Sequence, residues 1–246
     1  MGNKRLSVRD KRRQQLRRQR IITILIVVGV AVVFVGILIA PTLRNALAPV
    51  GDVTVPPTLN IPNPDRNMMG NPNAPVTIVE FSDFQCPYCK QFHDTLQQTL
   101  IQQYVEPGTV YFTYRTMGPW IGPESGAAAE AAYCAADQNR FWDYQNILFA
   151  NQGAENGGSF ANKRLVAFAE ALGLNMNDFN ACLDGNKYQN QVNQDRADGD
   201  AAGVQGTPSF VINGKLVGGA LTAQGLQQEI DAALNASGIS SPTPTP

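Results

Sequence analysis

The sequence predicts an α/β domain that follows a single N-terminal membrane-spanning helix. A charge-free apolar run near the start is long enough to cross a bilayer. Further along, segments with strand periodicity stand on both sides of a long stretch with helical periodicity. A Cys-x-x-Cys pair lies where the first predicted strand meets the first predicted helix. Together these three observations predict the fold class.

The first forty residues combine a basic tail with an apolar helix. Residues 1–20 hold nine Lys or Arg and one Asp, although the whole chain has a net charge of only −1. A basic tail alone would fit nucleic-acid binding, but the next 20 residues, 21–40, have no charge and would span about 30 Å as a helix. Because positively charged flanks stay in the cytoplasm, we expect a cytoplasmic tail, a membrane anchor and an extracytoplasmic domain.

A cleaved secretory signal is the alternative interpretation of this segment. The apolar part of such a signal normally spans about 7–15 residues, so this one is long. Ala46-Leu47-Ala48 resembles a cleavage site, although Pro49 directly after it disfavours processing. Cleavage would give a secreted protein. Both interpretations place the later cysteines outside the cytoplasm, where disulfides persist.

Proline-rich and low-complexity segments flank the predicted domain. Residues 41–75 contain eight prolines, which favour an extended and semi-stiff chain. We therefore expect a tether over residues 41–66 and a folded domain over residues 67–236. The last segment, residues 237–246, ends in alternating Pro and Thr and is expected to be disordered.

Within the domain, strand and helix periodicities succeed one another. Residues from about 118 to 203 show helical periodicity only, which predicts a helical insertion. The dipeptide Asn213-Gly214 predicts a two-residue hairpin turn between the last two strands. The predicted strands cover residues 76–81, 109–114, 209–212 and 215–217, and the predicted helices cover residues 86–104, 124–137, 140–151, 162–172, 177–183, 188–202 and 221–236.

The motif Cys86-Pro87-Tyr88-Cys89 predicts redox chemistry. On the first turn of a helix, Cys86 and Cys89 face the same side and can bond to each other. Pro87 suits this turn because a residue there has no helical partner for its N–H. The start of the helix would stabilise Cys86 as a thiolate, and Cys89 would be the more buried resolving thiol.

Zinc binding and a purely structural disulfide are the alternatives for this motif. Zinc needs four ligands, and the sequence offers only Cys134, Cys182 and His93 as further soft ligands, without a second Cys-x-x-Cys. So tight a loop also constrains the unfolded chain little, which argues against a purely structural disulfide. We therefore expect neither a metal ion nor another cofactor.

Further motifs make the chain resemble the DsbA-like thiol:disulfide oxidoreductases. They are residues 79–85 before the cysteines, residues 134–138 together with Phe141-Trp142, and residues 206–210 before the hairpin. The resemblance covers residues 67–236 and implies a thioredoxin fold with an inserted helical subdomain. It also implies that the Thr207–Pro208 peptide bond is cis and faces the cysteines, with Thr207 pairing with substrate as a strand would.

Glu80 lies on the predicted strand beneath the helix, between two apolar neighbours. The resemblance implies a buried acid with a raised pKa that helps Cys89 exchange its proton. An ordinary surface carboxylate is the alternative.

With Cys86 and Cys89 assigned to the redox pair, Cys134 and Cys182 remain as partners for a structural disulfide within the helical insertion. Two buried free thiols are the alternative there.

His93, Trp120 and Trp142 are further candidates for packing or site roles. His93 is the only histidine and is expected to be a packing or surface residue. Trp120 and Trp142 are expected in the hydrophobic core, since both belong to regions of helical aromatic spacing. Trp120 could instead line a substrate groove.

These observations predict an extracytoplasmic, monomeric enzyme that introduces disulfides into exported proteins. Its expected partners are reduced exported proteins and a membrane quinone-linked protein that reoxidises it, with no nucleic acid. The dipeptide Pro87-Tyr88 departs from the Pro-His that such oxidases more often have, so a disulfide isomerase or reductase on the same fold is the first alternative. A non-redox chaperone or peptide-binding module that uses Thr207-Pro208 is the second.

Overall fold

The structure is a computed structural model that describes residues 8–47, 50–218, 222–236 and 238. The chain divides into two compact units, residues 1–49 and residues 50–246. The predicted disordered tail lies outside the described residues apart from Gly238, and so does the end of the possible cleavage site.

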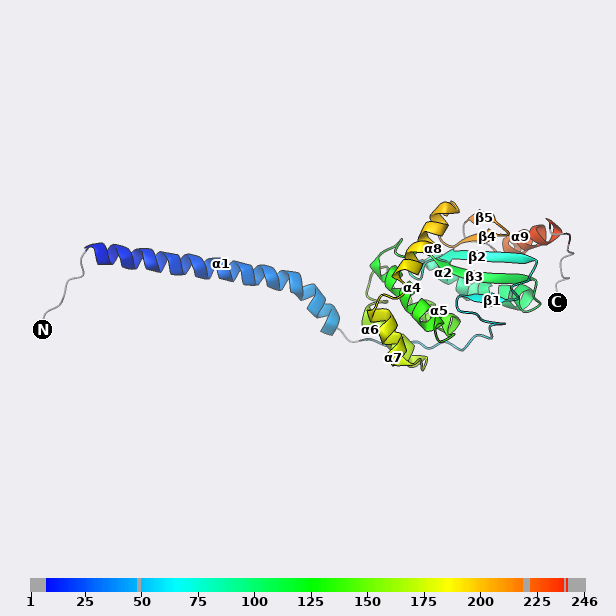
Figure 1. The fold of residues 1–246 in the computed structure, drawn as a ribbon, viewed down its shortest axis with the longest axis horizontal. Helices are drawn as coiled ribbons and strands as arrows, with labels where there is room; N and C mark the ends of the chain where they lie inside the picture. Colours follow the sequence, from blue (N-terminus) through cyan, green and yellow to red (C-terminus); the bar gives the residue numbers. More distant parts are fainter. Residues whose placement is uncertain (1–7, 48–49, 219–221, 237, 239–246) are drawn as a thin grey trace. The chain divides into compact units, whose positions relative to one another are not determined.

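The first unit is one long helix, α1 (Val8–Leu47). Within it, Leu16–Gly36 is long and apolar enough to cross a membrane, with a mean hydropathy of 2.3. The helix does not stop at Pro41, where the tether was expected to begin, because residues with good helix propensity follow the proline. Figure 1 shows the helix bending toward its C-terminal end, as expected where a proline removes a backbone donor. The apolar helix fits a single-pass anchor.

The second unit contains a five-stranded mixed sheet in the order β1-β3-β2-β4-β5. Strands β2 and β3 are parallel, and the other neighbouring pairs are antiparallel. The bounds are β1 (Met68–Gly70), β2 (Val76–Ser82), β3 (Val110–Thr116), β4 (Ser209–Ile212) and β5 (Lys215–Gly218). Ile212 pairs with Lys215, so the expected two-residue hairpin is present, and its residues Asn213 and Gly214 have φ angles of 46° and 83°. Only the short strand β1 was not predicted.

The helices form two groups around this sheet. Residues 87–105 run as one helical stretch in which α2 (Pro87–Phe92) and α3 (Gln98–Leu100) alternate with the π-helical segments η1 (His93–Gln97) and η2 (Ile101–Val105). Figure 1 shows the helices of the insertion gathered at one end of the sheet. They are α4 (Pro123–Ala136), α5 (Phe141–Ala150), α6 (Asn162–Ala171), α7 (Met176–Asp184) and α8 (Gln189–Ala201). The last helix, α9 (Ala223–Ala236), packs against β2 and β4. The thioredoxin-like fold with a helical insertion is therefore confirmed.

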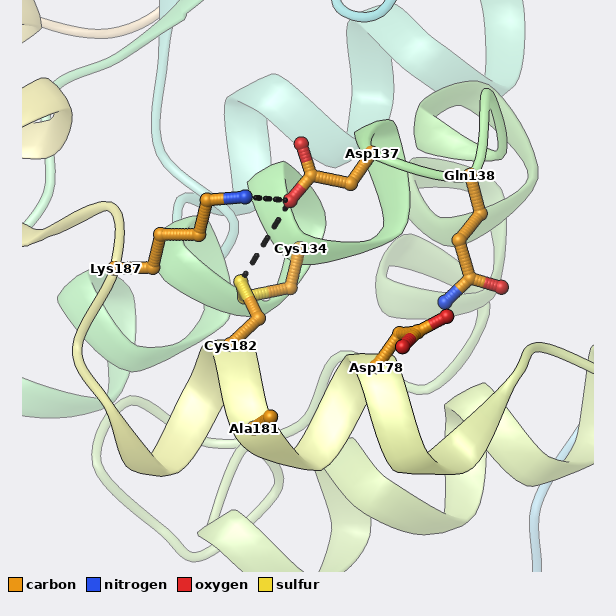
Figure 2. A pocket seen from close by; sticks show the side chains of 7 residues that line it. All are labelled: Cys134, Asp137, Gln138, Asp178, Ala181, Cys182 and Lys187. Carbon is orange, nitrogen blue, oxygen red and sulfur yellow. Dashed lines mark hydrogen bonds and ion pairs between the residues drawn. A yellow bond between two sulfur atoms is a disulfide. The ribbon is translucent and has the colours of Figure 1, made fainter.

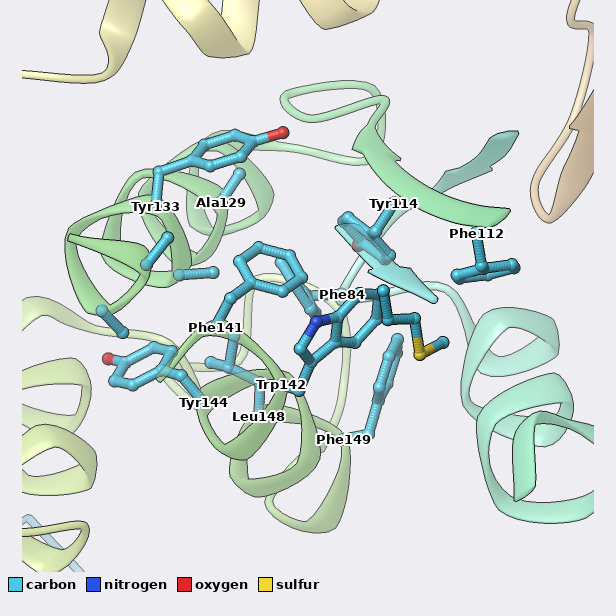
Figure 3. Close-up of a cluster of buried hydrophobic side chains, with 14 of the residues drawn as sticks. Phe84, Phe112, Tyr114, Ala129, Tyr133, Phe141, Trp142, Tyr144, Leu148 and Phe149 are labelled. Carbon is cyan, nitrogen blue, oxygen red and sulfur yellow. The ribbon is translucent and has the colours of Figure 1, made fainter. Parts of the chain in front are cut away.

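An aromatic core joins the insertion to the sheet. Phe84 stacks on Tyr114 of β3 with ring centroids 5.2 Å apart, and Tyr114 contacts Phe141 of α5 at 5.4 Å. Phe149, also on α5, contacts Phe84 at 5.4 Å. Figure 3 shows these rings converging between the strands and α5. Because Phe84 stands two residues before Cys86, the shared core positions the chain on which the cysteines lie.

The segment 50–66, expected as part of a Pro-rich tether, makes contacts with the rest of the second unit. The backbone N–H of Thr54 donates to Asn151 Oδ1 at 2.9 Å, and Asn146 Nδ2 donates to the carbonyl of Pro57 at 2.9 Å. Arg66 forms a 2.7 Å ion pair with Asp137. Proline makes the segment extended, but extended backbone leaves its carbonyls and amides free to bond to the side chains of the insertion.

Candidate active site

The Cys-x-x-Cys motif lies where β2 passes into α2. Cys86 has extended backbone angles and precedes the first helical residue, Pro87. Its N–H donates to the carbonyl of Asp83 at 3.0 Å, and its carbonyl accepts from the N–H of Lys90 at 3.1 Å. Cys86 is 5% exposed and Cys89 is fully buried, and both are free thiols. The helix start therefore holds one slightly exposed cysteine, Cys86, and one fully buried cysteine, Cys89, with Tyr88 exposed between them.

The turn before β4 lies against Cys86. The Thr207–Pro208 bond is cis, as the resemblance implied, and Cys86 Sγ donates to the carbonyl oxygen of Thr207 at 3.3 Å. Antiparallel pairing of β4 with β2 places Ser209 opposite Phe81. This pairing explains why residues so distant in sequence meet beside the sulfur.

The pKa of Cys86 is lowered to about 6. Its hydrogen bond with Cys89 is the largest cause, and Thr207 and the backbone amides of Cys89 and Tyr88 act in the same direction, against the effect of burial. A thiol with this pKa is mostly thiolate at neutral pH, which is the reactive form in disulfide exchange.

Cys89 and Glu80 have pKa values shifted the other way. Burial raises the pKa of Cys89 well above 9, and Cys86 and Glu80 add to the effect. The backbone N–H of Asp83 lies 3.4 Å from Cys89 Sγ. Glu80 is 1% exposed, and burial is the main cause that raises its pKa to about 8. Its Oε2 has no hydrogen-bond partner among the described residues, and burial favours the neutral form of this acid.

Three buried polar residues beside this pair were not singled out from the sequence. Ser82, Asp83 and Tyr114 are each 0% exposed. Asp83 Oδ1 accepts hydrogen bonds from the Ser125 hydroxyl at 2.6 Å and from the N–H of Gln85 at 2.8 Å. A signal was available, because Ser82 and Asp83 are two adjacent polar residues at the end of an apolar strand, shortly before the motif.

His93 and Trp120 lie in different surroundings. His93 packs on Phe149 with ring centroids 4.8 Å apart, and burial lowers its pKa. This agrees with the expected packing role. Trp120 is 36% exposed, with Arg196 stacked over its ring at 4.8 Å, so its expected place in the core was wrong. The Gly118–Pro119 bond before it is cis, and the loop lies at the surface, whereas Trp142 is buried as expected.

The expected disulfide between Cys134 and Cys182 is present and joins α4 to α7. It lies beside an open pocket of about 530 Å³. Figure 2 shows Asp137 at this pocket, reaching toward Cys182 and pairing with Lys187 at 2.7 Å. Among the described residues, no group of His, Cys, Asp or Glu side chains is arranged to hold a metal ion.

Comparisons with known proteins agree with this geometry. A family described as thioredoxin matches residues 63–232. The crystal structure of oxidised BdbD from Bacillus subtilis superposes with a TM-score of 0.64 at 23% identity, covering 75% of this chain and 100% of that one. In sequence, the "Probable disulfide bond formation protein D" of Bacillus cereus is 28% identical over 155 residues, covering 61% of this chain and 71% of that protein.

Part of a much larger protein is also similar. The "Na(+)/H(+) antiporter NhaA 3" of Salinispora tropica is 32% identical over 173 residues, which is 70% of this chain but 25% of the antiporter. The chain thus spans about a quarter of the length of the antiporter sequences that it matches. The match over residues 63–232 covers most of the second unit, including both cysteines of the motif. The chain therefore belongs to the thioredoxin family and resembles its DsbA-like thiol:disulfide oxidoreductases.

Proposed function

We propose that this protein is an extracytoplasmic thiol:disulfide oxidoreductase that introduces disulfides into exported proteins. The observation that carries the proposal is the contrast between two adjacent sulfurs. Cys86 has its pKa lowered to about 6, whereas the pKa of Cys89 is raised well above 9. A Bacillus cereus relative whose name refers to disulfide bond formation supports the same function.

The reaction begins with the enzyme oxidised. A substrate thiolate attacks Sγ of Cys86, the bond between Cys86 and Cys89 breaks, and a mixed disulfide forms between substrate and Cys86. A second substrate thiolate then attacks the substrate sulfur of that mixed disulfide, and Cys86 leaves as a thiolate. The substrate loses two electrons and two protons and gains a disulfide, and the enzyme becomes the dithiol form that the structure contains.

Glu80 would manage the proton in this reaction. When the first bond breaks, Cys89 leaves with a negative charge in a fully buried position. A neutral Glu80 with a pKa of about 8 can give its proton to that sulfur and recover one during reoxidation. No solvent access to Cys89 is then needed.

The lowered pKa of Cys86 favours an oxidase. At pH 7 it stabilises the reduced enzyme about tenfold relative to a cysteine with an ordinary pKa, which corresponds to about 30 mV in a two-electron couple. Tyr88 is exposed and adds no positive charge near Cys86. That observation supports the second candidate, a disulfide isomerase or reductase, which would have a lower potential.

The rest of the proposed cycle takes place at the membrane. Helix α1 would anchor the protein with its basic end in the cytoplasm, and the second unit would meet reduced exported proteins outside. A membrane quinone-linked protein would take the two electrons from Cys86 and Cys89. The protein would act as a monomer.

The test combines a potential with a trapping experiment. The Cys86–Cys89 couple is equilibrated with glutathione, and the purified protein is mixed with a reduced two-cysteine peptide. An oxidase should oxidise the peptide and have a potential nearer about −120 mV than the roughly −270 mV of a thioredoxin-type reductant. Mixed instead with the oxidised, disulfide form of the peptide, Cys89→Ser should accumulate a mixed disulfide through Cys86, whereas Cys86→Ser should not.

A low potential would assign the protein to the isomerase or reductase class. Failure of the wild-type protein to exchange disulfides with the peptide would contradict the proposed function altogether.

A further inference from the structure

The turn that precedes Cys86 is held by polar side chains of the helical insertion. Gln152, which follows α5, donates from its single amide nitrogen to two carbonyls, Phe84 O at 2.7 Å and Cys86 O at 3.0 Å. These two carbonyls belong to alternate residues of the turn. One side chain of the insertion therefore bonds to the backbone of the residue that carries the reactive sulfur.

A second set of contacts holds the same turn. Gln85 Nε2 donates to the Ser125 hydroxyl at 2.8 Å, and the backbone N–H of Asn156 donates to Gln85 Oε1 at 2.5 Å. The Ser125 hydroxyl in turn donates to Asp83. Asp83, Gln85 and Ser125 are each at most 3% exposed, so these bonds are protected from competition by water.

We infer that Gln152 is a positioning residue for disulfide exchange: through the carbonyls of Phe84 and Cys86 it orients the Cys86 sulfur toward the amides at the start of α2. The inference rests on the proposed function but concerns a different group. The four side chains whose hydrogen bonds hold this turn are together called the clasp: Asp83, Gln85, Ser125 and Gln152.

The physical reason lies in the peptide planes around Cys86. The carbonyl of Cys86 already accepts from the N–H of Lys90 at 3.1 Å, and Gln152 supplies its second hydrogen bond. With both bonds made, the peptide plane after Cys86 cannot rotate without losing one of them. That plane sets how the N–H groups of Tyr88 and Cys89 face the sulfur, and those groups help to stabilise its thiolate.

Removing the amide donors of Gln152 should therefore weaken thiolate stabilisation without touching either cysteine. The loss expected from one or two hydrogen bonds is a rise of about 0.5–1 unit in the titration midpoint of Cys86. At pH 7 the stabilisation of the reduced enzyme should then fall about 2.5- to 5.5-fold, so the couple should become less oxidising by about 12–22 mV.

The test uses Gln152→Met in the full chain, because methionine keeps the length of glutamine and lacks its N–H donors. Gln138→Met is the matched control. Gln138 also clamps a loop through its amide, donating to Asn175 O at 3.1 Å and accepting from Asn175 N at 2.7 Å, but its partner is the residue that caps α7. Each variant removes a side-chain amide that makes two hydrogen bonds. Gln138→Met therefore shows whether a general loosening of the insertion is enough to change the Cys86 titration.

Three quantities are measured for each variant: the thiolate titration of Cys86, the potential against glutathione, and the melting temperature. The inference expects Gln152→Met to raise the midpoint and lower the potential, with Gln138→Met unchanged in both. It is overturned if Gln152→Met keeps the wild-type midpoint and potential, or if Gln138→Met shifts them equally. If Gln152→Met does not fold, Gln152→Asn, which shortens the same donor, replaces it under the same criteria.

The proposed function fails separately from this inference. It fails if the wild-type protein does not exchange disulfides with a two-cysteine peptide, whatever the variants do. The inference about the clasp fails if the wild-type protein is active and the Cys86 titration does not depend on residue 152.

Discussion

The sulfur of Cys86 lies 3.3 Å from the carbonyl oxygen of Thr207, a residue 121 positions later in the chain. The contact joins the start of α2 to the cis-proline turn that leads into β4. A peptide that bonds to the backbone of Thr207 in a strand-like manner would lie directly over Cys86. The two parts of the proposed exchange site, the sulfur and the binding edge, are therefore already in contact in the reduced protein.

The thiolate of Cys86 should form at an unusually low pH. Titrating the reduced protein by the ultraviolet absorbance of its thiolates should show one transition near pH 6, because hydrogen bonds from Cys89, the side chain of Thr207 and the helix amides stabilise the anion. The second thiol, Cys89, should remain protonated well above pH 9. Cys86→Ser should remove the low transition. A single step near pH 9 in the wild-type protein would refute the proposed electrostatics.

Glu80→Gln should change how stability depends on pH. The folded-state pKa of Glu80, about 8, exceeds its ordinary value of 4.5. Below about pH 4.5 the burial of neutral Glu80 does not weaken folding. Between about pH 4.5 and 8 the free energy of unfolding of the wild type falls, because the carboxyl ionises in the unfolded chain but not in its buried position. Glutamine cannot ionise, so the variant should gain stability relative to wild type over this range, by at most about 5 kcal/mol at the upper end.

Urea unfolding at several pH values measures this difference. Glu106→Gln, which removes an exposed carboxyl of the same type, is the control variant. Glu80→Gln should also slow the formation of the mixed disulfide from the oxidised enzyme, because the leaving Cys89 would lose its proton donor. Equal pH profiles for Glu80→Gln and the wild type would show that the carboxyl is not buried as a neutral acid.

The disulfide between Cys134 and Cys182 should contribute to stability without taking part in exchange. It closes a loop with a sequence separation of 48, which corresponds to about 4 kcal/mol in the chain-entropy account. The double variant Cys134→Ser, Cys182→Ser should therefore unfold at lower urea and still oxidise a peptide. Loss of peptide oxidation in a variant that remains folded would give this disulfide a redox role that we do not assign to it.

The segment before β1 should stabilise the domain. A fragment that begins at residue 50 keeps the bonds from Thr54 to Asn151 and from Pro57 to Asn146, as well as the pair between Arg66 and Asp137. A fragment that begins at residue 67 loses them and should be less stable by about 2–4 kcal/mol in urea unfolding. Equal stability of the two fragments would restore the view of this segment as a free tether.

Much of the fold follows from local sequence patterns. The predicted ends of β2, β3, β4 and β5 and of the helices in the insertion lie within two residues of those observed, since periodicity, Pro at the first helical turn and an Asn-Gly hairpin act locally. The short strand β1 gave no such signal, because three residues are too few to show periodicity. The π-helical segments η1 and η2 depend on packing and were not predictable either.

The surroundings of individual side chains were less predictable. Trp120 has the composition of a core residue, yet its loop brings it to the surface beneath Arg196. Asp83 looks like an ordinary turn residue, yet it is buried because Ser125, 42 positions later, supplies a hydrogen bond. Such burial depends on partners that are distant in sequence, and one sequence without its fold does not identify them.

The sequence by itself determined the apolar helix, the order of strands and helices, and the two cysteines one helical turn apart, because each depends on neighbours within a few residues. Only the tertiary structure decided that Thr207 contacts Cys86, that Glu80 is buried so that its pKa is raised, and that Gln152 bonds to the turn. The reason is physical: a pKa or a hydrogen bond reflects all the groups within a few ångströms, and folding brings most of those groups from distant parts of the chain.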